Sequence, residues 1–145
     1  MTSWSDFEAA APELAARVRE RFDAHGHKTM ATLRRDGSPR ISGTEAQLED
    51  GELWIGSMPN ALKARDLQRD PRFALHSASE DPDVWTGDAK VAGAAEEVES
   101  PHGPGSHRFR LDLREVSTVE LDDERKHLII TVWTPEAGVR TMKRD

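Results

Sequence analysis

The sequence of 145 residues contains no cysteine, few aromatic residues and no long apolar run. Without cysteine the chain forms no disulfide, has no thiolate nucleophile and offers no sulfur ligand to a metal. A membrane-spanning helix needs about 20 consecutive apolar residues, and no stretch approaches that length. The first residues also lack the basic and then apolar pattern of a secretion signal. We therefore expect a soluble, cytoplasmic protein with no membrane partner.

The chain also has fewer basic than acidic residues. The chain carries 27 acidic residues against 20 lysines and arginines, a net charge of −7. An acidic surface repels phosphate backbones, so we expect no nucleic-acid partner, although a local basic pocket for one small phosphate remains compatible with this charge. The Walker loop, Gly-x-Gly-x-x-Gly and Gly-x-Ser-x-Gly motifs do not occur. The six histidines show no ligand spacing with a carboxylate, and we expect no metal site.

Hydrophobic periodicity predicts one long helix near the beginning of the chain, at about residues 6–24. Apolar residues recur there at spacings of three and four, at Phe7, Ala11, Leu14, Val18 and Phe22. Ser5 and Glu8 have the spacing of a capping box, and Gly26 is a plausible stop.

The rest of the chain reads mainly as short antiparallel strands. The turn signals Asp36-Gly37 and Asp50-Gly51 separate the first strands and favour a meander. Strands are expected at about 28–35, 39–48, 73–77, 90–98, 109–121 and 128–133, with another beginning at 53 and a last short one ending near 143. The prediction is one domain, 1–145, of the mainly β (α+β) class: a barrel of six to eight antiparallel strands with an N-terminal helix and one short helix. Because only 36% of the residues are hydrophobic, such a domain gains from pairing with a second copy.

One segment combines a strand, a loop and the short helix. The strand begins at Leu53, Asn60 is the expected cap, and the helix runs from Ala61 to about Arg69. Backbone amides at a helix start favour an anion, whereas the helix dipole disfavours a lysine there. Lys63 in the first turn therefore indicates an anionic guest, with an ordinary solvated lysine as an equally weighted alternative.

Two tryptophans, Trp54 and Trp133, lie in apolar strands. For each of them a place in the core is the favoured interpretation over a contact with a ligand.

Three runs of residues, taken in order and spacing, resemble a known family. They are Arg40-Ile41-Ser42-Gly43-Thr44, then residues 50–57 (Asp-Gly-Glu-Leu-Trp-Ile-Gly-Ser), then residues 63–75 (Lys-Ala-Arg-Asp-Leu-Gln-Arg-Asp-Pro-Arg-Phe-Ala-Leu). The endings 128–135 and 138–140 are similar too. The chain resembles the pyridoxamine 5′-phosphate oxidase-like superfamily, and it looks most like the small actinobacterial flavin/deazaflavin oxidoreductases within it.

The resemblance implies a split β-barrel homodimer with FMN or the deazaflavin coenzyme F-420 in a groove between subunits. Some family members bind haem or have no known activity. By the same resemblance Arg40 and Lys63 would hold phosphate, and the strands at 41–43 and 55–57 would line the ring and tail. The expected cofactor-binding residues are Arg40, Ile41, Ser42, Gly43, Ile55, Gly56, Ser57, Asn60, Leu62 and Lys63. The implied activity is hydride transfer to or from a small molecule, and no catalytic residue is identified.

The sequence departs from the family pattern at two positions. Glu45 stands where FMN-using members carry a lysine, and Ala61 stands where a serine commonly precedes the retained Lys63 by two residues. Both changes weaken the expected hold on a phosphate. A second hypothesis therefore stays open, a non-catalytic protein that binds or sequesters a cofactor, or one that binds no cofactor at all.

Overall fold

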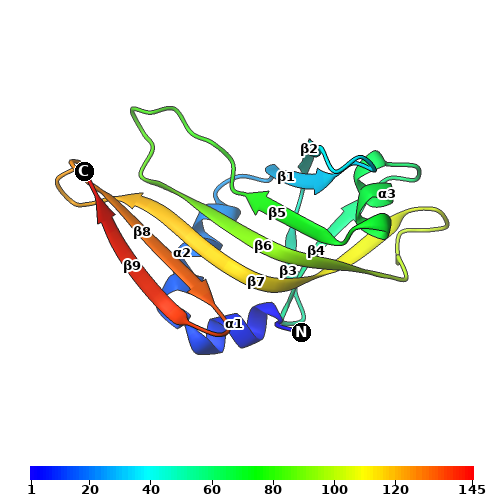
Figure 1. The fold of residues 1–145 in the computed structure, drawn as a ribbon, viewed down its shortest axis with the longest axis horizontal. Helices are drawn as coiled ribbons and strands as arrows, with labels where there is room; N and C mark the ends of the chain where they lie inside the picture. Colours follow the sequence, from blue (N-terminus) through cyan, green and yellow to red (C-terminus); the bar gives the residue numbers. More distant parts are fainter.

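In the computed structural model, which describes residues 1–145, the chain begins with two short helices where the sequence predicts a single long one (Figure 1). Helix α1 spans Trp4–Ala10 and α2 spans Pro12–Asp23. Proline at position 12 has no N–H to donate and favours the first position of a new helix, so the chain breaks at Ala11. The capping box is formed by Ser3 with Asp6, not by Ser5 with Glu8. The hydroxyl of Ser5 instead donates to the carbonyl of Gly51.

Nine strands form one antiparallel sheet, one more than the upper limit of the prediction. They are β1 (Lys28–Leu33), β2 (Pro39–Thr44), β3 (Gln47–Glu49), β4 (Glu52–Ser57), β5 (Arg72–His76), β6 (Gly87–Val98), β7 (His107–Leu121), β8 (Leu128–Thr134) and β9 (Gly138–Arg144). The extra strand arises because the expected strand 39–48 is interrupted after Thr44. The mainly antiparallel split-barrel prediction is confirmed.

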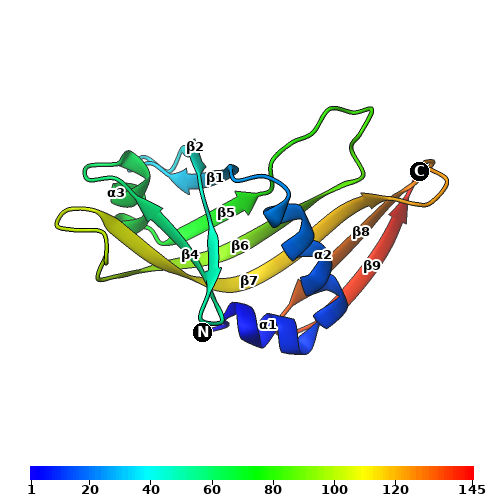
Figure 2. The same ribbon diagram turned by 180° about the vertical axis from the view of Figure 1, so that it is seen from behind.

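The 15-residue strand β7 organises the sheet, whose order is β2-β1-β5-β6-β7-β4-β3. Its first residues pair with β4, while residues 116–121 pair with β8 on the same edge. Strand β6 pairs with β7 along nearly its whole length. Because two separate hairpins share one edge of β7, the sheet splits and curls in two directions (Figures 1 and 2).

Gly93 makes the long β6–β7 pairing possible. The register shifts between Ala92 and Gly93, and a Cβ at Gly93 would lie 1.8 Å from the carbonyl oxygen of Asp112. Only a residue without a side chain allows so close an approach of the two strands. The hairpin that continues beyond this bulge projects residues 99–106 toward the β4–α3 connection.

The core lies between the sheet and the two N-terminal helices, which cover one of its faces (Figure 2). Phe7 is fully buried and contacts both Trp4 and Trp133, with ring centroids 5.2 and 4.9 Å apart. The prediction of Trp133 as a core residue is thus confirmed. The same prediction for Trp54 is wrong, because it is half-exposed under the guanidinium of Arg108, 3.8 Å from the ring centroid. None of the three helices has both the length and the apolar composition that crossing a membrane requires.

Candidate cofactor site

The predicted strand, loop and helix are present, but the helix begins without a side-chain cap. Helix α3 spans Leu62–Arg69, and its N-cap residue is Ala61. Asn60, the expected cap, adopts a left-handed conformation with φ 66°, and its Oδ1 accepts a hydrogen bond from Arg65 at 3.3 Å. That prediction is wrong because the helix begins one residue later than expected, so Ala61 is the cap, and the Asn60 side chain pairs with Arg65 instead. The first amides of α3 are therefore left without a side-chain acceptor.

The side chain of Lys63 extends from the first turn of α3 to β2. Its Nζ donates to the carbonyl oxygen of Gly43 on β2 at 3.1 Å, and the side chain is half-buried. Burial lowers the pKa of Lys63 below its ordinary value because the ammonium group loses water. The first turn contains no acidic residue to compensate the charge. A neighbouring anion would offset the free-energy cost of burying the charged ammonium group.

A polar pocket of about 440 Å³ surrounds the lysine. We define it by its lining residues, Thr44, Glu45, Gln47, Gly56, Ser57, Met58, Pro59, Lys63, Ser100, His102, Ser106 and His107. It brings together Gly56, Ser57 and Lys63 from the predicted set, and Glu45 also lines it. The Oγ atom of Ser57 is buried and has no hydrogen-bond partner.

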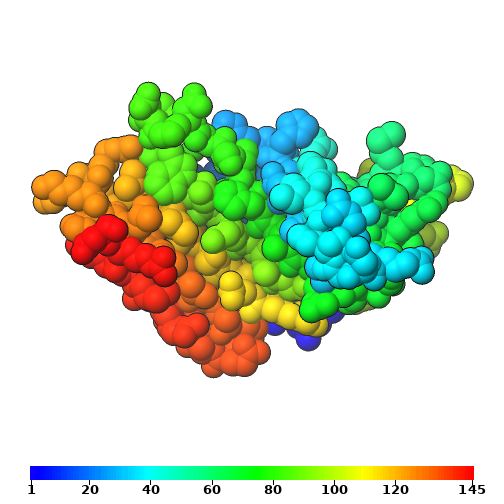
Figure 3. Space-filling view, turned by 45° about the horizontal axis from the view of Figure 1, so that its top comes forward, coloured from blue at the N-terminus to red at the C-terminus, as the bar shows by residue number.

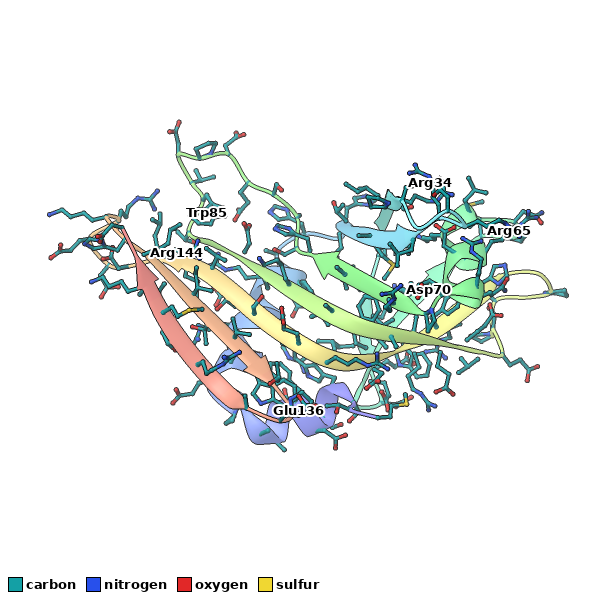
Figure 4. The ribbon with its side chains drawn as sticks, viewed as in Figure 1. Arg34, Arg65, Asp70, Trp85, Glu136 and Arg144 are labelled. Atoms are coloured by element: carbon teal, nitrogen blue, oxygen red, sulfur yellow. The ribbon has the colours of Figure 1, made fainter.

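Arg40 lines a different cavity, an open arginine groove of about 470 Å³. The groove is lined by Arg34, Arg35, Asp36, Arg40, Leu62, Arg65, Asp66 and Arg69. Figure 4 shows Arg34 and Arg65 at the end of the molecule that carries α3. Arg40 and Lys63, both predicted to hold phosphate, therefore lie in two separate cavities at the start of the same helix.

The other predicted residues divide among different environments. Ile41 is 75% exposed and lines an apolar hollow on the outer face of the sheet. Ile55 is buried in the core, so only its backbone is available to a ligand. Ser42, Gly43 and Asn60 line none of these three cavities.

The sequence analysis missed the two histidines of the polar pocket, His102 and His107. The predicted strand starts only at about residue 109, yet in the structure His107 begins strand β7 and pairs with Ser57. The alternation of Phe109 and Leu111 after it is the one sequence signal that could have extended the strand back to His107.

Comparison with known proteins rests on the fold alone. The sequence matches no protein-family model, and no curated protein matches it. Among solved structures, PhzG from Burkholderia lata 383, in complex with tetrahydrophenazine-1-carboxylic acid, has a TM-score of 0.66 and 13% identity, covering 94% of this chain and 88% of that one.

Two further solved structures share the fold. A pyridoxamine 5′-phosphate oxidase-related, FMN-binding protein from Nostoc punctiforme PCC 73102 has a TM-score of 0.65 and 14% identity, covering 90% of this chain and 94% of that one. A haem-binding protein from Mycobacterium smegmatis has a TM-score of 0.63 and 15% identity, covering 92% and 88%. The fold predicted from the resemblance is thus confirmed, and it is shared by proteins with different ligands.

Proposed function

We propose, from the premise of a pyridoxamine 5′-phosphate oxidase-like split β-barrel, that this chain binds a phosphate-bearing flavin-type cofactor at the start of α3. The cofactor is FMN or the deazaflavin F-420, and the activity is hydride transfer to or from a small molecule. The observation that carries the proposal is Lys63, a half-buried ammonium group with one carbonyl partner beside an uncapped helix start. Both features favour a phosphate at this place.

The polar atoms around Lys63 fit such a group. Ser57 offers a buried hydroxyl without a partner, and Gly56 allows a ligand to approach the strand backbone closely. When bound, the cofactor would supply the hydride donor or acceptor, while the chain binds and orients it. The name of the Nostoc neighbour, an FMN-binding protein, supports the same class of ligand.

We also propose that two copies associate through the outer face of β1, β5 and β6. This face carries the apolar hollow, of about 450 Å³, whose at least partly exposed apolar side chains include Ile41 of the neighbouring strand β2, Ala74 and Ala92. Figure 3 looks onto this side, where the green loop after β5 and the cyan β1–β2 hairpin both stand out. Exposed apolar surface of this kind is typical of an interaction site.

A second candidate is a non-catalytic protein that binds or sequesters a cofactor. Glu45 favours it, because its carboxylate lines the same pocket as Lys63 and opposes an incoming phosphate. The neighbour from Mycobacterium smegmatis, named a haem-binding protein, supports a binding function on this fold.

Absorbance spectroscopy separates the candidates. The purified protein is titrated with FMN, with F-420 and with haem, and any flavin complex is then tested for reduction and reoxidation. Saturable FMN or F-420 binding followed by turnover supports the oxidoreductase. Binding of either flavin without turnover, or binding of haem alone, supports the second candidate. An absence of binding to both flavins overturns the cofactor proposal.

A further inference from the structure

His107 is held in one orientation by a carboxylate from the neighbouring strand. Its Nδ1 lies 2.7 Å from Oε2 of Glu97. Gln68 on α3 donates from Nε2 to Oε1 of the same carboxylate at 3.0 Å. Because an ionised carboxylate only accepts hydrogen bonds, the imidazole proton sits on Nδ1. This leaves Nε2 as the nitrogen that changes protonation, and the protein provides no partner for it.

Ser57 lies directly opposite His107 on the adjacent strand β4. Side chains at directly opposed positions of antiparallel strands leave the same face of the sheet, with Cβ atoms about 4.5–5.5 Å apart. The Ser57 hydroxyl is buried without a partner, although buried hydroxyl groups are normally hydrogen-bonded. Two adjacent groups on one wall of the polar pocket are therefore unsatisfied by the protein.

The charged groups that face His107 come from four places. Glu97 extends from β6, Lys63 from α3, Glu45 from the β2–β3 connection and His102 from the β6–β7 connection. Glu97 is already occupied by the Nδ1 proton and by Gln68. A protonated His107 would face Lys63 across the pocket, and of the two acids only Glu45 would remain to balance both cations.

We propose that the polar pocket is an anion site in which protonated His107 donates from Nε2, together with Lys63 and the Ser57 hydroxyl, to a phosphate or carboxylate group of a ligand. Glu97 orients the ring through its contact with Nδ1. The anionic group belongs either to the proposed cofactor or to its substrate. The site itself requires only the side chains described above, so it does not depend on the cofactor proposal.

Anion binding at this site depends on pH in a defined direction. Neutral imidazole with its proton on Nδ1 presents a lone pair at Nε2, and this lone pair repels an anion. The ligand therefore binds more tightly at lower pH, where the imidazole is protonated and donates from Nε2.

Sulfate is the probe for this test, because it keeps the same charge throughout the range. Its affinity is measured at about pH 5.5 and about pH 7.5 from the ring signals of His107 in NMR spectra. Losing one charge-assisted hydrogen bond weakens binding by roughly tenfold or more. We therefore expect sulfate to bind at least about tenfold more weakly at the higher pH. Absence of sulfate binding, or equal affinity at both values of pH, would overturn the proposal.

Matched variants identify the responsible histidine. In His107→Gln the pH dependence should disappear, whereas His25→Gln and His27→Gln, both exposed and outside the pocket, should keep it. A pH dependence that persists in His107→Gln, or that disappears in either control, contradicts the assignment. If His107→Gln fails to fold, the change in the His107 ring signals when sulfate is added to the unaltered protein still decides the question.

FMN and riboflavin, which lacks the phosphate, distinguish the source of the anion. A preference for FMN that is lost in His107→Gln assigns the site to the cofactor phosphate. Sulfate binding as predicted, with an FMN affinity that His107→Gln does not change, assigns it to the substrate. Sulfate binding as predicted with no flavin binding supports the anion site and rejects only the cofactor proposal.

Discussion

Arg40 donates a hydrogen bond from Nε to Oδ2 of Asp66 at 2.7 Å, and Asp66 is only 2% exposed. The same carboxylate accepts from the hydroxyl of Thr32 and from the guanidinium of Arg69. It thereby ties β1, β2 and α3 together just beside the candidate site. Burial alone would raise the pKa of Asp66, but the hydrogen bonds from Arg40, Thr32 and Arg69 outweigh it and lower the pKa.

The first prediction concerns this carboxylate. Asp66→Asn should lower the free energy of unfolding at neutral pH by about 2 kcal/mol. Removing one partner of a buried ion pair costs about 3–5 kcal/mol, but Arg40 and Arg69 are 21% and 32% exposed, so water compensates them in part. Since the folded-state pKa is depressed, the stabilisation is complete above the unfolded pKa of about 4 and is lost as pH falls through the folded value.

Denaturant unfolding at pH 7 and at about pH 3 checks this prediction. The difference between wild type and Asp66→Asn should be largest at pH 7 and should shrink at the lower pH. The matched control is Asp83→Asn, an exposed residue in the loop before β6, which should leave stability nearly unchanged. Equal effects of the two substitutions would mean that the hydrogen bonds of Asp66 do not stabilise the packing of β1, β2 and α3.

A second prediction tests the bulge in the β6–β7 pairing. Gly93→Ala should destabilise the protein by about 3 kcal/mol, because its Cβ would collide with the carbonyl of Asp112. Gly43→Ala is the control, since Gly43 is also a strand glycine and a Cβ there meets nothing within 4 Å. Ligand-free melting temperatures of the two variants compare them directly. A comparable melting temperature for Gly93→Ala and wild type would show that β6 and β7 do not approach as closely as described.

Apolar periodicity predicted most of the buried face of the N-terminal helices correctly. The spacing of apolar residues identifies the buried side of a helix even when the predicted ends of that helix are wrong. It did not locate the break at Ala11, although Pro12 carries that information. The predicted number of strands was too low because the interruption between Thr44 and Gln47, which separates β2 from β3, lacks a strong turn signal. Element ends are decided by local hydrogen bonds that periodicity does not contain.

The candidate site was less predictable than the fold. Lys63 and Ser57 belong to one continuous segment and could be singled out from it. His107 reaches the same pocket only through the register of β7 against β4, and Glu97 through the register of β6 against β7. A slip of one residue would turn each side chain to the other face. Such long-range registers cannot be inferred from one sequence.

A third prediction concerns the departure from the family pattern at Glu45. Glu45→Lys should strengthen FMN binding, because it removes a negative charge from the polar pocket and adds a positive one. Glu136→Lys makes the same charge change in the β8–β9 turn, far from the pocket (Figure 4), and corrects for net charge. Fluorescence titration with FMN measures both. If the FMN affinity rises equally in the two variants, or rises in neither, the Glu45 carboxylate does not act on the cofactor.

A fourth prediction concerns association. Sedimentation of the wild type at micromolar concentration should show a dimer, and Ile41→Asp should shift it toward monomer, because a charge would be placed on the exposed apolar face. Val139→Asp alters a residue on β9 that is also exposed but lies near α2, and it should leave the dimer intact. A monomeric wild type would exclude the dimer. A dimeric Ile41→Asp would show that the interface does not include the face around Ile41.

The most direct test of the account compares FMN with riboflavin on wild type and Lys63→Met. A charge-assisted hydrogen bond contributes about 1.5–3 kcal/mol, so wild type should bind FMN roughly ten- to a hundred-fold more tightly than riboflavin. Lys63→Met should abolish most of this preference, while the exposed Lys126→Met keeps it. The ligand-free melting temperature should change little, because Lys63 makes a single hydrogen bond, to Gly43. Equal affinities of wild type for FMN and riboflavin, or an FMN preference that survives in Lys63→Met, would contradict a phosphate site at the start of α3.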